Sequence, residues 1–210
     1  MSDTVLQAEG LCFGWPERPL FDHWSVRIRP GVTLLRGEES SGKTTLLRLL
    51  AGELAAQSGL LQLSGVRGVR LDQQPERYRQ QVFRTDPHND ELDAHSAADW
   101  FRTLPQRYPR FNAEAVAELA HGFALTPHLD KPLYMLSTGS KRKVWLAAAF
   151  AAGAAVTMID DPFAALDKPA IGFLRELLQD AATHPSRAWI VADYTAPAGV
   201  ALAAMVELAG

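Results

Sequence analysis

A glycine-rich segment that ends in a lysine and two threonines stands early in the sequence. Residues 37–44 read GEESSGKT and fit the pattern G-x-x-x-x-G-K-[S/T]. Backbone N–H groups of such a loop surround the phosphates of a nucleotide, and the lysine adds a positive charge at the same oxygens. The segment therefore predicts a nucleotide-phosphate site. The alternative is a glycine turn that only precedes an ordinary helix.

Each side chain of this segment has a place in that prediction. The residues expected to surround the phosphates are Gly37, Ser40, Ser41, Gly42 and Lys43. The Thr44 hydroxyl is suited to bind Mg²⁺, and Thr45 is expected to reach the α-phosphate. Glu38 and Glu39 must point outward, because carboxylates facing a polyanion would weaken the affinity.

Two adjacent carboxylates follow an apolar run later in the chain. Residues 156–159 (VTMI) lead directly into Asp160 and Asp161. A hard cation bound to phosphates takes one carboxylate as a ligand, and a second carboxylate can orient and polarise the attacking water. Adjacent residues of a strand point to opposite faces, so the two can take separate roles. We expect Asp160 to hold Mg²⁺ and Asp161 to orient water, the alternative being an ordinary Asp-Asp-Pro turn.

Hydrophobic periodicity indicates the elements that position these groups. Strands are predicted at 5–11, 25–28, 32–35, 60–63, 81–84, 155–159 and 188–192. Helices are predicted at 43–50, 137–152 and 169–182, together with a helical region at 96–125 that breaks near Pro105 and Pro109. Residues 67–80 are polar and expected to be exposed. Strands first, then helices, then alternating strands and helices predict an α/β core that carries a helical insertion.

Length and composition limit the class of protein. The chain has 210 residues and a formal net charge of −3, with 47% hydrophobic and 21% charged residues, which is typical of a globular protein. Its single cysteine, Cys12, excludes an internal disulfide and a multi-cysteine metal site. The slight acidity argues against a nucleic-acid partner. Neither a signal peptide nor a spanning segment is predicted, which favours a cytoplasmic location.

Taken together, these motifs resemble those of ATP-binding cassette (ABC) ATPases, the nucleotide-binding subunits of membrane transporters. Residues 136–140 (LSTGS) stand where that family has its LSGGQ signature, and residues 165–167 (ALD) resemble its D-loop. Trp15 falls where the family stacks an aromatic residue on adenine, although core packing is equally open. The resemblance implies that Ser137 and Gly139 contact the γ-phosphate bound by the other subunit of a head-to-tail dimer. Without the other motifs, Ser137 would be interpreted as a plain helix N-cap.

The resemblance also implies the architecture of the chain. It predicts a P-loop NTPase fold of the ABC ATPase type, with a mainly parallel core sheet, an antiparallel β-subdomain and a helical subdomain. Residues 1–210 would form a single domain. Within it, about 1–86 and 151–210 would form the nucleotide-binding core and about 87–150 the helical subdomain.

The sequence departs from the family pattern where hydrolysis is controlled. Asp161 stands at the position of the catalytic glutamate, and Asp193 stands at the position of the switch histidine. The glutamine of the Q-loop is missing, so Asp86 or His88 occupies that region. Lys43, Asp161 and Asp193 are the candidate catalytic residues, and hydrolysis is expected to be slow.

The function implied is that of the ATP-driven engine of a membrane transporter. It would bind ATP and Mg²⁺ and act as a dimer beneath a separate integral membrane permease, at the inner face of the membrane. The short chain and residues 136–143 (LSTGSKRK) resemble compact exporter-type subunits, such as those of haem-export or drug-export systems. Residues 141–143 (KRK) are expected on a solvated helix face, with a membrane or partner contact as the alternative.

Two other functions remain open. The first is a switch that dimerises on binding ATP and hydrolyses it slowly or not at all, as a homodimer or as the degenerate half of a heterodimer. The second is a soluble cassette ATPase that acts on nucleic acid or ribosomes. Such proteins usually carry two cassettes, whereas this chain holds one.

Overall fold

The structure, a computed structural model, describes residues 4–64 and 68–208. Within these residues, four antiparallel strands form one sheet in the order β2-β1-β4-β5, and five parallel strands form a second in the order β6-β7-β8-β3-β9. The first sheet consists of β1 (Leu6–Trp15), β2 (Arg18–Ile28), β4 (Ser58–Leu63) and β5 (Val69–Arg70). The second consists of β3 (Gly31–Arg36), β6 (Val82–Arg84), β7 (Val156–Asp160), β8 (Ala188–Asp193) and β9 (Leu202–Glu207). The predicted α/β class, with its parallel core sheet and its antiparallel sheet, is confirmed.

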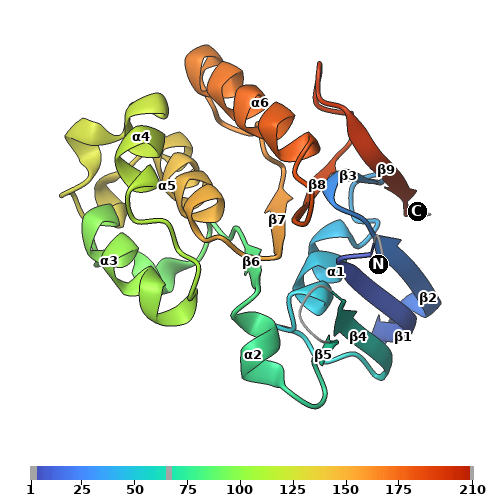
Figure 1. Ribbon diagram of the computed structural model, residues 1–210. Coiled ribbons are helices and arrows are strands. Elements are labelled where there is room, and N and C mark those ends of the chain that lie inside the picture. Colours follow the sequence, from blue (N-terminus) through green and yellow to red (C-terminus); the bar gives the residue numbers. More distant parts are fainter. Residues whose placement is uncertain (1–3, 65–67, 209–210) are drawn as a thin grey trace.

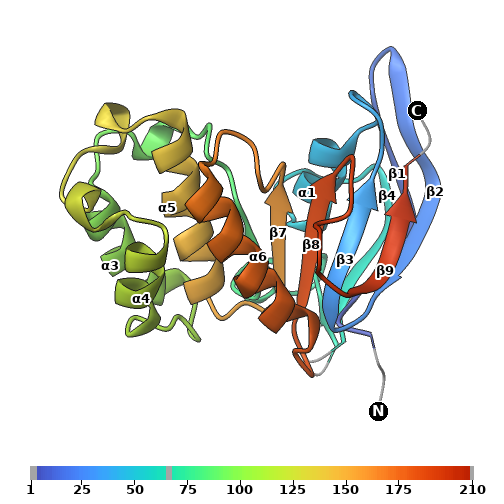
Figure 2. The ribbon, with the colours of Figure 1, turned by 90° about the horizontal axis from the view of Figure 1, so that it is seen from above.

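Two helices cover opposite faces of the parallel sheet. Helix α1 (Lys43–Leu50) lies between the two sheets, and α6 (Lys168–Ala182) lies on the other face (Figure 2). Alternate residues of β7 belong to the two apolar clusters that result, since Met158 packs in the cluster of α1 and Ile159 in that of α6. Burial of the strand on both faces explains why its sequence is a continuous apolar run.

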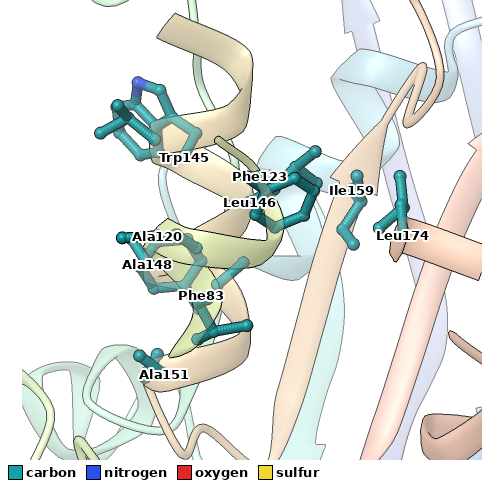
Figure 3. Packing of buried hydrophobic residues seen from close by; sticks show 14 of the residues in the cluster. Phe83, Ala120, Phe123, Trp145, Leu146, Ala148, Ala151, Ile159 and Leu174 are labelled. Carbon is teal, nitrogen blue, oxygen red and sulfur yellow. The ribbon is translucent and has the colours of Figure 1, made fainter. Parts of the chain in front are cut away.

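Three further helices gather beside the parallel sheet, on the side away from the antiparallel sheet (Figure 1). They are α3 (Ala97–Arg107), α4 (Ala115–Gly122) and α5 (Thr138–Ala151), with single 3-10 turns at Asp90–Leu92, Thr126–His128 and Leu133–Met135. Figure 3 shows Leu146 of α5 and Phe123 on the side of Ile159 and Leu174, and all four belong to one buried cluster. This packing holds α5 against the strand that ends in Asp160.

The polar stretch at 67–80 is only partly as predicted. Arg67 lies outside the described residues. The rest contains a short helix, α2 (Pro75–Arg79), and its Tyr78 is fully buried rather than exposed. The Tyr78 hydroxyl donates a hydrogen bond to the Leu50 carbonyl at 2.7 Å. A five-residue helix spans too few turns to show a periodic apolar pattern, which is why the sequence does not reveal it.

The predicted break near Pro105 and Pro109 falls between the two prolines, and Pro105 itself does not cause it. Helix α3 continues through Pro105 and ends at Arg107. A proline so near the end of a helix removes only the bond that its N–H would make to Phe101, and few residues follow it. The break falls instead at Tyr108, which is extended and precedes Pro109, as the steric restriction on residues before proline predicts.

Candidate nucleotide-binding site

The loop at residues 37–42 joins β3, which lies between β8 and β9 in the parallel sheet, to the first turn of α1. Gly42 has a φ of 93°, and a Cβ there would lie 3.2 Å from the Phe21 ring, so both the backbone and the space favour glycine. Ser40 also adopts a left-handed conformation, with a φ of 61°. The residue at the N-cap of α1 is a glycine without a side chain to cap the helix. The first N–H groups of α1 are therefore available to an anion.

The Lys43 ammonium lies against this loop. Its Nζ donates to the carbonyl oxygens of Gly37 at 2.6 Å and Glu38 at 2.8 Å. The same Nζ lies 4.6 Å from the ring centroid of Tyr194, which follows β8. Lys43 is only 9% exposed, so a positive charge is held at the place where phosphate oxygens would be attracted.

Thr44 and Asp160 meet at the junction of α1 and β7. Thr44 Oγ1 donates to Asp160 Oδ2 at 2.5 Å. Burial raises the pKa of Asp160. The Thr44 hydrogen bond lowers this pKa, and the negative charge of Asp161 raises it. A hydroxyl and a carboxylate oxygen are ligands that Mg²⁺ takes beside phosphate and water oxygens. The pair therefore fits the metal site that the sequence predicts.

Asp160→Asn is expected to stabilise the fold at neutral pH. Because burial raises the pKa of Asp160 in the folded state above the ordinary 3.8, ionising the carboxyl costs stability as the pH rises through that pKa. An asparagine keeps an acceptor for Thr44 without the charge. In urea unfolding at pH 7 the variant should unfold at a higher concentration than the parent, and the difference should vanish below pH 3.8. A variant less stable than the parent at pH 7 would contradict this reading.

Asp161 has a different environment from its neighbour. Its φ is 45°, and its side chain is exposed. The backbone is held at both ends, because its N–H donates to Ala192 O at 3.0 Å and its carbonyl accepts from Arg142 Nη1 at 2.6 Å. Arg142 Nη1 also donates to Asp160 O at 3.0 Å. A buried guanidinium of α5 thus fixes the backbone of both aspartates, and the Asp161 carboxylate has no hydrogen-bond partner among the residues that the structure describes.

The expected solvated face at residues 141–143 is wrong. Arg142 and Lys143 are buried, and Lys143 Nζ lies 2.6 Å from Asp167 Oδ2 at the start of α6. Lys141 Nζ lies 2.5 Å from Asp93 Oδ1. Successive helix residues are about 100° apart, so three in a row cannot share one exposed face. These charges tie α5 to the neighbouring elements.

Asp193 ends β8, and its carboxylate turns back on its own loop. Oδ1 accepts from the backbone N–H of Tyr194 at 2.6 Å and of Thr195 at 3.4 Å. Tyr194 is a site residue that the sequence reasoning missed. The available signal was an aromatic residue just beyond the carboxyl end of a central strand, where α/β proteins bind ligands.

The side chains of the loop and of the strand ends line a cavity of about 350 Å³. The residues that line it are Trp15, Arg18, Leu20, Glu39, Ser40, Gly42, Lys43, Thr44, Thr45, Asp160, Asp161 and Tyr194. Trp15 is 48% exposed, so its ring is available for stacking rather than part of the core. Arg18, which was not predicted, donates from Nη2 to Ser40 O at 2.8 Å and so supports the loop. Glu38 and Glu39 are exposed, as expected, although Glu39 still lines the cavity.

Other predicted residues lie outside the lining of this cavity. Gly37 and Ser41 belong to the loop, where Gly37 binds Lys43 through its carbonyl and Ser41 Oγ is buried without a hydrogen-bond partner among the described residues. Of the two Q-loop candidates, Asp86 lies 2.7 Å from Arg84 Nη2 and lines a separate cavity of about 390 Å³, whereas His88 is exposed.

The candidate signature residues also lie outside it, at the first turn of α5. Ser137 is exposed and is the N-cap, and its Oγ accepts from Ser140 N at 3.1 Å. A Cβ on Gly139 would collide with the carbonyl oxygen of Ala165, so glycine allows residues 165–167 to pass close to the helix. Within one chain, the described residues thus place the signature segment outside the phosphate cavity.

The sequence profile of the ABC transporter family matches residues 21–164. The chain belongs to the ABC transporter family. The cytochrome c biogenesis ATP-binding export protein CcmA 1 of Cupriavidus metallidurans is 32% identical over 192 residues, which cover 91% of this chain and 90% of that protein. CcmA of Rhodospirillum rubrum is 32% identical over an alignment of 217 positions, which covers 95% of this chain and 85% of that protein. The family resemblance of the motifs is therefore confirmed, and this chain is an ABC transporter ATPase subunit.

Solved structures agree on the fold of this ABC ATPase. An ATP-binding subunit of an ABC transporter superposes with a TM-score of 0.80 at 22% identity, covering 90% of this chain and 79% of the other. An ABC transporter ATP-binding protein of Pyrococcus furiosus gives a TM-score of 0.74 at 20% identity, covering 98% of each. Within the described residues, no helix has the length and apolar character needed to cross a bilayer.

Proposed function

We propose that this ABC ATPase hydrolyses Mg-ATP to drive export through a separate integral membrane permease, and that it sits on the cytoplasmic face of the membrane. The observation that carries the proposal is the meeting of Lys43, the Thr44–Asp160 pair and the exposed Asp161 in one cavity. The CcmA relatives are named as ATP-binding export proteins of cytochrome c biogenesis. That likeness supports export in cytochrome c biogenesis for this chain, rather than drug export.

The roles that we assign follow from the contacts of each group. The loop N–H groups and Lys43 bind the phosphates, and the exposed ring of Trp15 stacks on adenine. Thr44 and Asp160 hold Mg²⁺, which when bound offsets the negative charge of the phosphates. Asp161 accepts a hydrogen bond from water and orients it, because its exposed carboxylate lines the same cavity.

We also propose the division of the domain that the resemblance implies. Residues 1–86 and 151–210 would form the nucleotide-binding core and residues 87–150 the helical unit, with 1–3, 65–67 and 209–210 lying outside the described residues. In support, helices α3 to α5 lie to one side of the parallel sheet (Figure 1), and every residue that lines the phosphate cavity comes from the proposed core.

A second chain would complete the site. Ser137 and Gly139 stand at the exposed start of a 14-residue helix, whose N-terminus suits an anion, yet they do not line the cavity of their own chain. Two chains related by a two-fold axis would each offer this helix start to the γ-phosphate bound by the other. The partner would be a second copy of this chain or a related ABC ATPase.

Ser137→Arg should block ATP-dependent dimerisation, because a long cation at the helix start would fill the place proposed for the partner's nucleotide. Light scattering at saturating ATP, under conditions that prevent hydrolysis, should show dimers for the parent and monomers for the variant. Nucleotide binding to the monomer should be unchanged, since Ser137 does not line that cavity. Monomers of the parent at saturating ATP, both alone and with the permease, would refute the dimer.

A catalytically weak switch is the second candidate function. It is favoured by Asp161, one methylene shorter than the family glutamate, and by Asp193, whose carboxylate is bound to the backbone of its own loop. Such a protein would dimerise on ATP and release it slowly.

The permease is tested by purifying the chain from detergent-solubilised membranes of its native cell. We expect an integral membrane protein to co-purify in fixed ratio. The chain should return to the soluble fraction when that protein's gene is deleted. Purification of the chain alone from intact membranes, with no membrane protein in fixed ratio, would contradict the proposal.

A further inference from the structure

Tyr194 lines the cavity of the phosphate loop, and its ring lies against the Lys43 ammonium. Its ring centroid lies 4.6 Å from the Lys43 ammonium, and the residue lines the cavity together with Asp161. The lysine of a phosphate loop reaches the terminal phosphates of a bound nucleotide. A group in contact with that lysine is therefore within reach of the γ-phosphate.

The neighbouring carboxylates cannot donate a hydrogen bond to the γ-phosphate. Asp161 and Asp193 carry carboxylates, which when ionised only accept hydrogen bonds and repel phosphate oxygens. Asp193 is in addition engaged with the N–H groups of Tyr194 and Thr195. The Tyr194 phenol can donate, because a tyrosine hydroxyl keeps its proton at neutral pH, and partial desolvation together with the nearby carboxylates of Glu39 and Asp161 raises its pKa further.

We propose that Tyr194 is the residue by which this ABC ATPase distinguishes ATP from ADP, its hydroxyl donating a hydrogen bond to the γ-phosphate beside Lys43. Asp193 is then a positioning residue that holds the turn carrying Tyr194. The inference rests on the proposed function, since it assumes that the cavity binds ATP. A hydrogen bond from a phenol to a phosphate anion is charge-assisted, and only ATP offers the acceptor.

The ring and the hydroxyl of Tyr194 have separable effects. Tyr194 lines a second cavity of about 400 Å³ as well, together with Gly37 and Glu38 of the loop, so this residue borders both spaces. Removing the ring would open the site and disturb every ligand alike. Tyr194→Phe keeps the ring over Lys43 and removes only the hydroxyl, so it isolates the proposed hydrogen bond.

The test compares the affinities of Tyr194→Phe for Mg-ATP and Mg-ADP by calorimetry. We expect the ATP affinity to fall about tenfold, or ~1.4 kcal/mol, while the ADP affinity stays within about twofold of the parent. Turnover should fall by about tenfold or more, because the γ-phosphate is no longer held in position. The matched control is Tyr134→Phe, at a tyrosine that is 62% exposed and outside both cavities, and it should change neither affinity.

Two results would overturn the inference. An ATP affinity in Tyr194→Phe equal to that of the parent would show that the hydroxyl does not contact the γ-phosphate. Equal losses for both nucleotides would give Tyr194 a merely structural role. A parent protein that binds neither nucleotide would overturn the proposed function as well, so the two failures are distinguishable.

Discussion

Lys43→Ala should weaken Mg-ATP binding by roughly tenfold or more, which is at least ~1.4 kcal/mol. The cavity is lined by two cationic side chains, Arg18 and Lys43, against three carboxylates, those of Glu39, Asp160 and Asp161. Removing Lys43 leaves one cation to offset these groups and the phosphates together. Lys43 is also the cation held directly against the loop carbonyls of Gly37 and Glu38.

The measurement is isothermal titration calorimetry with Mg-ATP. Lys168→Ala is the matched control, since Lys168 is an exposed lysine at the start of α6 and does not line the cavity. Urea unfolding of Lys43→Ala checks that the variant is folded, because Lys43 is buried. A Mg-ATP affinity of Lys43→Ala equal to that of the parent would show that the loop at residues 37–44 does not bind the nucleotide.

Asp161→Asn should lower ATP turnover by about 100-fold or more while leaving Mg-ATP binding in place. The substitution keeps the size of the side chain and removes the charge that would orient water. Asparagine tolerates the left-handed conformation of residue 161 as well as aspartate does, so the fold should survive. Thr44 and Asp160 still hold the metal. Turnover by the asparagine variant as fast as the parent's would show that Asp161 is not the catalytic carboxylate and would favour the switch.

Asp161→Glu completes the comparison. A glutamate carboxylate reaches roughly 1.5 Å further, and a misplacement of about 1 Å can change a rate on the order of 100-fold. If the parent site is simply short, glutamate raises turnover. If the backbone of Asp161, held by Ala192 and Arg142, already compensates, glutamate lowers it. Turnover unchanged by both substitutions would contradict any role of this carboxylate.

The parts of the site that the sequence predicted are those whose signal is contiguous. The phosphate loop and the aspartate pair are each a short run of residues directly after a buried strand. The residue types and their spacing were therefore enough to predict both. The sequence did not reveal the roles of Arg18, Arg142 and Tyr194, because these roles depend on contacts between distant segments of the chain. Arg142, for example, reaches from α5 to the carbonyls of Asp160 and Asp161.

The fold shows the same division. Strands buried on both faces, such as β7, were predicted within a residue or two of their bounds. The edge strand β9 was missed, because its sequence LAAMVE is rich in alanine and has only one β-branched residue. Its place in the sheet comes from parallel pairing with β3, more than 160 residues earlier in the chain, which no local pattern records.

The most direct test of the account is phosphate release from Mg-ATP by the purified chain, with Lys43→Ala measured in parallel as the blank. The account predicts release that requires Mg²⁺, saturates with ATP and disappears in the blank, at a slow rate in keeping with Asp161 in place of glutamate. Release no greater than that of the blank, both alone and with the permease, would contradict an ATP-hydrolysing subunit and leave the dimerisation switch as the function.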